Sequence, residues 1–128
     1  MIRVLVVDDE AAPRELLRTS LQRSGRCQIV GEGLDGHDAI RLARELQPDV
    51  VILDVDMPRR NGLAALADVR RVAAHTRVLV YSSHGLAQRD EALQRGAHAY
   101  RSKGDPLKQL VEDVIAIASR DISYVVDR

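Results

Sequence analysis

Three apolar runs, at residues 2–7, 50–53 and 77–81, constrain the fold of this chain more than any other feature of its sequence. Each is rich in Val, Ile and Leu at consecutive positions rather than at alternate ones. Strands of this kind are buried on both faces, which is typical of parallel sheets covered by helices on both sides. Two shorter runs, at 27–31 and 98–102, bring the number of predicted strands to five.

Segments with a helical spacing of apolar residues separate these strands. The first has Pro13 in its first turn and places Leu16, Leu17 and Leu21 on one face. The fourth is expected over residues 86–94 and carries only a thin apolar stripe. The inner faces of the second, third and fifth helices are predicted to carry Ala39, Ile40, Ala43 and Leu46; Leu63, Leu66 and Val69; and Leu107, Leu110, Val111, Val114 and Ile115.

The chain therefore repeats a strand–helix unit five times in 128 residues. Right-handed crossovers leave few topologies for such a chain. By analogy with known proteins of this pattern, we expect a flavodoxin-like (βα)5 fold, an α/β doubly wound parallel sheet with strand order 2-1-3-4-5. The length favours one domain. We assign it to residues 1–118, followed at 119–128 by a C-terminal tail or linker stub with an extended segment at 122–126.

Composition narrows the classes of function. The formal net charge is zero, whereas nucleic-acid binders usually carry a basic surplus, so we expect no direct nucleic-acid binding. No apolar run approaches the length of a membrane span. Three acids at 8–10 directly follow the first apolar run, which does not fit a secretory signal. We therefore expect a cytoplasmic protein without membrane contact, and its single Cys27 excludes an internal disulfide.

Carboxylates follow two strands that are neighbours in this topology. Asp8 and Asp9 follow the first strand, and Asp54 ends the third. Ligands of such sheets bind beyond the carboxyl ends of the strands, where the strand order reverses, so these side chains should converge. Converging carboxylates repel one another, and Mg²⁺, which prefers hard oxygen ligands, would relieve that repulsion. Asp8 or Asp9 alone could equally cap the first helix, but a lone carboxylate ending an apolar strand favours function for Asp54.

The same edge of the sheet is expected to carry a hydroxyl and an ammonium group, because the fourth strand ends at Ser82 and the fifth near Lys103. Taken alone, Ser82 could equally be an ordinary serine in a turn, and Lys103 could be a solvated surface charge. Together with a carboxylate nucleophile and a metal ion, they suit phosphoryl transfer, which depends on positioning and charge stabilisation.

Four segments resemble the signature of response-regulator receiver domains: 6–10 (VVDDE), 53–62 (LDVDMPRRNG), 80–83 (VYSS) and 96–103 (GAHAYRSK). The resemblance extends over residues 2 to about 118. It implies that Asp54 accepts a phosphoryl group, with Mg²⁺ as cofactor. The metal would be bound by Asp54, by Asp9 directly, by Asp8 through water and by the backbone carbonyl of Asp56.

The resemblance also implies a switch. Lys103 would pair with Asp54 before phosphorylation and with a phosphoryl oxygen afterwards, while Ser82 would swing inward to bond another phosphoryl oxygen. Tyr100 would follow by moving between exposed and buried rotamers, although it also fits an ordinary strand aromatic. The face formed by the fourth strand, fourth helix and fifth strand would then favour a second arrangement and control an output domain or partner.

Two positions at the mouth of the predicted site, Asp56 and His84, would tune the lifetime of the acyl phosphate. His84 could equally be an exposed loop histidine without such a role. The pairs Met57–Pro58 and Asn61–Gly62 would shape the loop after the third strand, and Asn-Gly is a strong turn signal in its own right.

Gly104 follows Lys103 where many receivers have Pro, and the run 103–106 (KGDP) resembles receivers of the LuxR-like, DNA-binding class. That class implies a sensor histidine kinase or phosphotransfer protein as partner and transcription regulation as output. It also implies a helix-turn-helix effector domain outside these 128 residues, and it allows a homodimer on phosphorylation. Such a chain is a phosphoacceptor switch rather than an enzyme, since it promotes only its own phosphotransfer and autodephosphorylation.

Three alternatives belong to other classes. The run Asp54–Val55–Asp56 also resembles the Asp-x-Asp of haloacid-dehalogenase-type phosphatases, but it follows the third strand rather than the first, in a short chain. A non-phosphorylated pseudo-receiver would be a pure interaction module, whereas here all the functional positions are filled. A flavodoxin-type nucleotide binder would need a glycine-rich loop after the first strand, where this chain has acids.

Overall fold

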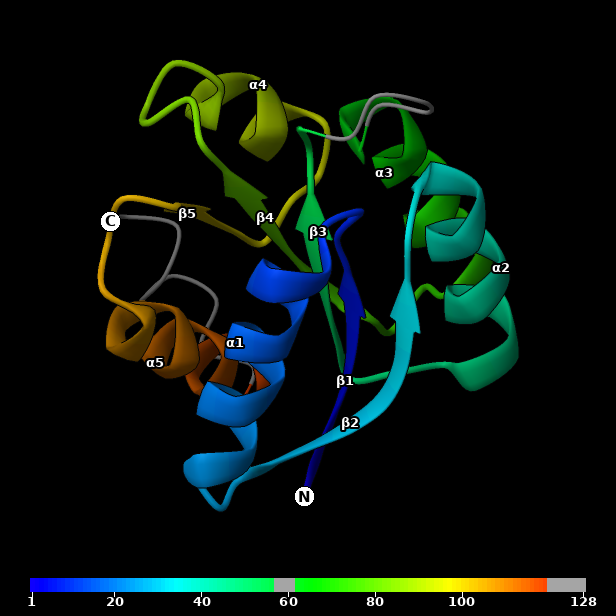
Figure 1. Cartoon of the computed structure of the whole chain (residues 1–128). Coiled ribbons are helices and arrows are strands. Elements are labelled where there is room, and N and C mark those ends of the chain that lie inside the picture. The colour runs from blue at the N-terminus through cyan, green and yellow to red at the C-terminus, as the bar shows by residue number, and fades with distance from the viewer. Residues whose placement is uncertain (57–61, 120–128) are drawn as a thin grey trace.

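The computed structural model describes residues 1–56 and 62–119. Strands and helices alternate along the chain as predicted (Figure 1). All the strands pair in parallel in a single sheet of order β2-β1-β3-β4-β5, which confirms the flavodoxin-like topology. The elements are β1 (Ile2–Val7), α1 (Ala11–Arg23), β2 (Cys27–Gly33), α2 (Gly36–Leu46), β3 (Val50–Asp54), α3 (Gly62–Val72), β4 (Arg77–Ser82), α4 (Arg89–Gln94), β5 (Ala99–Ser102) and α5 (Leu107–Ala118).

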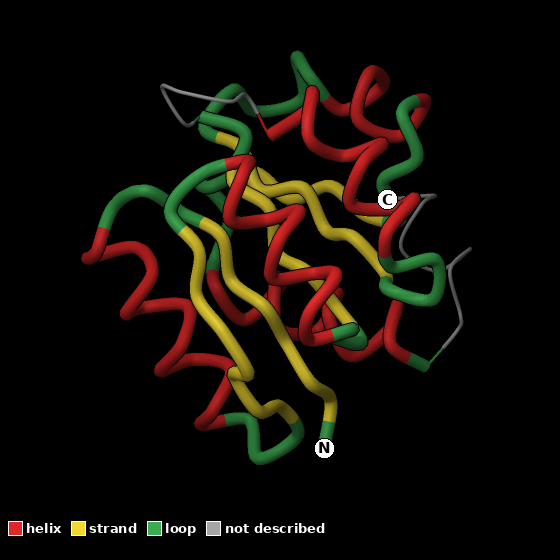
Figure 2. The backbone as a smooth tube through the Cα atoms, turned by 90° about the vertical axis from the view of Figure 1, so that its right-hand side faces the viewer, coloured by secondary structure: helices red, strands yellow, loops and turns green. Residues whose placement is uncertain are grey.

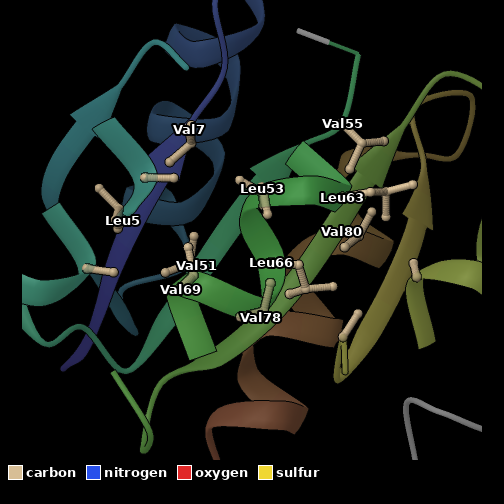
Figure 3. Close-up of a cluster of buried hydrophobic side chains, with 14 of the residues drawn as sticks. Leu5, Val7, Val51, Leu53, Val55, Leu63, Leu66, Val69, Val78 and Val80 are labelled. Carbon is tan, nitrogen blue, oxygen red and sulfur yellow. The ribbon is translucent and has the colours of Figure 1, made fainter. Parts of the chain in front are cut away.

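Helices cover both faces of the sheet, so the central strands are buried on both sides (Figure 2). Leu5 and Val7 of β1 face α2 and α3, in the cluster drawn in Figure 3, while Val4 and Val6 face α1 and α5. Each fully buried Leu, Ile or Val side chain stabilises the fold by about 1.5–3 kcal/mol. The consecutive apolar residues that predicted the strands are therefore explained by two cores, one on each face.

Two details of the helices differ from the sequence predictions. Leu16 was expected on the inner face of α1, but it is 59% exposed, because Leu17 and Leu21, four residues apart, already fill that face. The fourth helix was expected from residue 86, but α4 begins at Arg89. Two turn hydrogen bonds, from the Ala87 amide to the His84 carbonyl and from the Arg89 amide to the Leu86 carbonyl, keep residues 85–88 in turns after Gly85, whose φ is +57°.

Three sequence predictions fall on residues outside the described ranges. They concern the loop pair Met57–Pro58, Asn61 of the pair Asn61–Gly62, and the extended segment at 122–126. Within the described part of the chain, no helix has both the length and the apolar character needed to cross a membrane.

The register of the sheet aligns the ends of the strands. Val7 of β1 pairs with Leu53 of β3, so Asp8 and Asp54 follow neighbouring positions on adjacent strands. Ser82, the last residue of β4, pairs with Ser102 of β5, which directly precedes Lys103. The parallel topology therefore gathers these polar residues at one edge of the sheet, beyond the carboxyl ends of the strands.

Candidate functional site

Three carboxylates meet at this edge. Asp8, Asp9 and Asp54 each offer an oxygen within 4.8 Å of the others. Asp8 and Asp54 are buried, whereas Asp9 is exposed. Neither Asp8 nor Asp9 caps α1, because the N-cap residue of that helix is Glu10. Instead, Asp8 Oδ1 accepts the backbone amide of Glu10 at 2.9 Å, which fixes the start of the loop between β1 and α1.

The donor set fits a hard divalent cation such as Mg²⁺. Asp8 Oδ2 and Asp54 Oδ2 are buried, and neither accepts a hydrogen bond from any residue in the ranges 1–56 and 62–119. Buried carboxylate oxygens normally have a hydrogen-bond donor or a metal ion as partner, because desolvating a charge is costly. Mg²⁺ binds through one or two carboxylates and retains several waters, and exposed Asp9 leaves one side of this group open to solvent.

Asp54 is paired with Lys103 in the arrangement that the resemblance implies for an unphosphorylated receiver. Asp54 Oδ1 accepts a hydrogen bond from Lys103 Nζ at 3.0 Å and another from the Asp56 amide at 2.8 Å. Lys103 Nζ also lies 3.4 Å from Asp56 Oδ2 and 3.9 Å from Asp8 Oδ2. A single ammonium group therefore neutralises part of the charge of three carboxylates.

Burial raises the pKa of Asp54 to about 6, with a further increase from the charge of Asp8, even though the Asp56 amide and Lys103 favour the charged form. Burial alone would lower the pKa of Lys103, but its hydrogen bond to Asp54 and the nearby acids raise that pKa instead. Lys103 is therefore charged at pH 7. Asp54 is mostly ionised at that pH, in an environment that disfavours its charge.

Asp56 lies at the mouth of the site and connects it to the loop between β4 and α4. Its Oδ2 accepts the Ser83 amide at 2.8 Å, and its Oδ1 lies 3.0 Å from Nε2 of the half-exposed His84. Burial would raise the pKa of Asp56, but the Ser83 hydrogen bonds and the charge of Lys103 outweigh burial and lower it. Asp56 is therefore an anion that holds this loop against the site.

Ser82 is fully buried, and its hydroxyl is engaged by that same loop. It donates to Gln88 Oε1 at 3.2 Å and accepts the His84 amide at 3.0 Å. Tyr100 is half-buried, and its hydroxyl donates to the Gly85 carbonyl. These contacts tie the β4–α4 loop both to the end of β4 and to β5.

Gly62, the first residue of α3, lets that helix approach the end of β3 closely. A Cβ at this position would lie 2.4 Å from the Asp54 carbonyl oxygen and 3.0 Å from Val55 Cα. Both neighbours are backbone atoms, which cannot move aside without displacing the strand that carries Asp54. Any larger residue would therefore disturb the site.

The structure brings the eight predicted site residues to one edge of the sheet, but their roles and the position of the Asp56 carbonyl stay predictions. Sequence reasoning missed Gln88 as the partner of Ser82. It also missed the contacts of the Asp56 carboxylate with Lys103 and with the Ser83 amide. A polar residue in a turn has no periodic signature, so nothing in the sequence could have marked Gln88.

A protein-family model described as "Response regulator receiver domain" matches residues 4–115. Transcriptional regulatory protein PdtaR of Mycobacterium tuberculosis is 38% identical over 120 residues, which cover 92% of this chain and 57% of that protein. A protein-glutamate methylesterase/protein-glutamine glutaminase of Koribacter versatilis is 34% identical over 123 residues, 90% of this chain and 34% of that protein. The chain spans less than two thirds of the length of such relatives, from 30% of a protein-glutamate methylesterase/protein-glutamine glutaminase of Thermotoga maritima to 60% of a "Putative transcriptional regulator" of Pseudomonas aeruginosa.

Among solved structures, a two-component response regulator of the LuxR family from Aurantimonas superposes with a TM-score of 0.88 at 30% identity. The superposition covers 99% of this chain and 96% of that one. The sheet order, the site at the strand ends and the match over residues 4–115 lead to one conclusion: the chain belongs to the family of response-regulator receiver domains.

Proposed function

We propose that this receiver is switched by phosphorylation of Asp54, with Mg²⁺ bound by Asp8, Asp9, Asp54 and the backbone carbonyl of Asp56. The observation that carries the proposal is the pairing of Lys103 Nζ with Asp54 Oδ1 at 3.0 Å beside three converging carboxylates. An ammonium group, a carboxylate nucleophile and a metal-binding cluster are the parts that phosphoryl transfer needs.

In the proposed reaction, a carboxylate oxygen of Asp54 forms a bond to phosphorus while the bond between phosphorus and the donor's leaving atom breaks. The products are an acyl phosphate on Asp54 and the released donor, a histidine side chain or a small molecule such as acetate. Mg²⁺, when bound, neutralises charge on the phosphoryl oxygens. Asp54 Oδ2, which has no hydrogen-bond donor among the described residues, is the less encumbered of its two oxygens.

The other residues act on the phosphoryl group after transfer. Lys103 exchanges its hydrogen bond with Asp54 for one with a phosphoryl oxygen, and the Ser82 hydroxyl donates to another. The Tyr100 ring then changes its position, because its hydroxyl is bonded to the same β4–α4 loop that Ser82 holds. The surface of β4, α4 and β5 thereby changes, which is the output of the switch.

The partners follow from the same proposal. A sensor histidine kinase or phosphotransfer protein supplies the phosphoryl group, and an effector domain or target protein reads the switched surface. Transcription regulation is the output that we favour, since PdtaR is named a transcriptional regulatory protein. The domain boundary at residue 118 coincides with the last residue of α5. We therefore propose that the receiver occupies residues 1–118, and we expect it to operate in the cytoplasm.

The test is intact-mass spectrometry after incubation with Mg²⁺ and acetyl phosphate. We expect wild type to gain one phosphoryl group, and we expect Asp54→Asn and chelator-treated wild type to gain none. A phosphoryl adduct of undiminished yield in Asp54→Asn would contradict the assignment. Steady turnover of a phosphomonoester would instead favour the phosphatase alternative.

His84 and Asp56 are proposed to set the lifetime of the acyl phosphate, because their side chains pair at 3.0 Å at the mouth of the site. We expect His84→Ala to admit water more readily and to shorten the half-life of the phosphorylated form, measured as loss of the mass adduct after the donor is removed. His75→Ala, in a turn away from the site, is the control. An unchanged decay rate in His84→Ala would end this assignment.

A further inference from the structure

We propose that Gln88 is a latch for the unphosphorylated state: its side-chain amide oxygen holds the Ser82 hydroxyl and competes with the phosphoryl group for that hydroxyl's proton. This inference rests on the proposed function and adds a positioning residue to it. Gln88 acts through Ser82, and it lies outside the group of carboxylates proposed to bind Mg²⁺.

The hydrogen bonds of Ser82 make the competition specific. A serine hydroxyl has one proton, and here Gln88 Oε1 receives it at 3.2 Å. The oxygen of the same hydroxyl accepts the His84 amide at 3.0 Å, which holds the hydroxyl against the loop. Ser82 is fully buried, so water does not offer its proton an easy alternative acceptor. A phosphoryl oxygen on Asp54 can take this proton only after Gln88 has released it.

The place of Gln88 in the fold connects this exchange to α4. Gln88 is the N-cap residue of α4, and its backbone carbonyl accepts the Ala92 amide at 3.0 Å. Its side chain makes no capping hydrogen bond to the helix, so the amide group serves Ser82 instead. The hydroxyl at the end of β4 is therefore bonded directly to the N-cap residue of the helix that the switch is expected to move.

Packing alone anchors α4 weakly. Of its six residues, only Ala92 is buried, whereas α3 and α5 each bury five. Ala92 has a short side chain and contributes little apolar area. Hydrogen bonds of the preceding loop therefore contribute much of the stability of the start of α4. Breaking the bond between Gln88 and Ser82 should allow that end of the helix to move.

The two acceptors of the Ser82 proton favour different states. Gln88 can accept it only in the arrangement seen here, and a phosphoryl group can accept it only in the switched arrangement. A ligand shifts a two-state equilibrium by its difference in binding free energy between the states. Removing the Gln88 acceptor therefore makes the switched state easier to reach, and a phosphoryl mimic should bind more tightly.

The experiment uses Gln88→Met, which keeps the length of the side chain and removes the acceptor, with Gln94→Met at the exposed end of α4 as the matched control. Calorimetric titrations with beryllofluoride at saturating Mg²⁺ give the affinity for the phosphoryl mimic. Since a hydrogen bond contributes about 0.5–1.5 kcal/mol net, we expect beryllofluoride to bind Gln88→Met about 2- to 10-fold more tightly than wild type. Gln94→Met should match wild type, and Mg²⁺ affinity without beryllofluoride should be equal in all three proteins.

A double-mutant cycle with Ser82→Ala separates the latch from a general loosening of α4. In the Ser82→Ala background the hydroxyl is gone, so Gln88→Met should no longer change the affinity. An equal gain in that background, or no gain in the wild-type background, overturns the latch while leaving the proposed function intact. Failure of wild type itself to bind beryllofluoride with Mg²⁺ overturns both the proposed function and the latch.

Discussion

Asp54 occupies an environment that opposes its own charge. It is 1% exposed, it has buried Asp8 beside it, and burial raises its pKa to about 6 despite the hydrogen bond from Lys103. A carboxylate in such a place is retained at the expense of stability. Its Oδ1 is paired with Lys103 and the Asp56 amide, but its Oδ2 has no hydrogen-bond donor among the described residues. At the scale of single residues, the site is therefore set up for ligands rather than for a stable fold.

Removing that charge should stabilise the protein when no divalent metal is present. The pKa of Asp54 is raised in the folded state, so the penalty is absent below pH 4, develops between pH 4 and pH 6 and is complete at pH 7. We expect Asp54→Asn to increase the free energy of unfolding by about 2–3 kcal/mol at pH 7 and by much less at pH 4. Urea denaturation of both proteins in chelator, at several pH values, measures the difference.

Asp90→Asn is the control for this measurement, because the side chain of Asp90 is 90% exposed and its neutralisation should change stability little. A loss of stability in Asp54→Asn at pH 7, or an equal gain at both pH values, would contradict the electrostatic description of the site.

At the scale of elements, β5 is joined to α5 by an ion pair between half-buried Arg101 and fully buried Asp113. Arg101 Nε donates to Asp113 Oδ2 at 2.7 Å, and Arg101 Nη1 donates to Asp105 Oδ2 at 3.0 Å. Asp113 is fully buried, so this guanidinium group offsets part of the cost of burying a carboxylate. Because Asp105 lies two residues after Lys103, the same arginine also steadies the loop that carries the Lys103 ammonium group.

Truncating this arginine should destabilise the fold strongly. We expect Arg101→Met to lower the free energy of unfolding by about 3–5 kcal/mol in urea denaturation, because the contact of buried Asp113 with the Arg101 guanidinium group is then lost. The double variant Arg101→Met/Asp113→Asn, which also removes the buried charge, should be more stable than Arg101→Met alone. A double variant that is equally or less stable would show that the penalty does not come from the charge of Asp113.

A second element-scale contact extends the pairing of β4 and β5 with a side chain. The His98 amide donates to the Val78 carbonyl at 2.8 Å, and His98 Nδ1 accepts the Val78 amide at 3.0 Å. The ring must be unprotonated at Nδ1 to accept this bond. Burial, together with the charges of Arg70 and Arg77, lowers the pKa of His98 to about 4.

This lowered pKa predicts a loss of stability in mild acid. The contribution of His98 is fully present above pH 6.5 and declines as the pH falls toward 4, since the unfolded chain binds a proton that the folded ring does not. Between pH 7 and pH 5 we expect wild type to lose about 2 kcal/mol more than His98→Asn, which keeps an acceptor but does not titrate. Urea denaturation at the two pH values tests this, and an identical pH dependence in both proteins would contradict it.

At the scale of the whole molecule, consecutive apolar residues predicted the buried strands correctly, because a strand between two helical layers must be apolar on both faces. The topology rules then indicated which strand ends are neighbours. This is why Asp8 and Asp54 could be expected together although they lie 46 positions apart. Fold and the location of the candidate site therefore followed from patterns that extend over entire elements.

What the sequence did not predict depends on individual side chains and backbone angles. The structure starts α4 at Arg89 rather than at residue 86, because turn hydrogen bonds close residues 84–87 and 86–89, and no sequence pattern indicated them. The bond between Gln88 and Ser82 joins a turn to a strand end, where no periodicity applies. Such contacts are fixed by the packing of the finished fold, so they become visible only in the structure.

The central claim is that Asp54, among the carboxylates gathered at this edge of the sheet, accepts the phosphoryl group. The most direct measurement is to phosphorylate the chain with acetyl phosphate and Mg²⁺, reduce the acyl phosphate with borohydride to homoserine and locate the modified residue by peptide sequencing in a mass spectrometer. We predict homoserine at position 54 and unmodified aspartate at positions 8, 9 and 56. Homoserine at one of those three positions, with position 54 unmodified, would contradict the account.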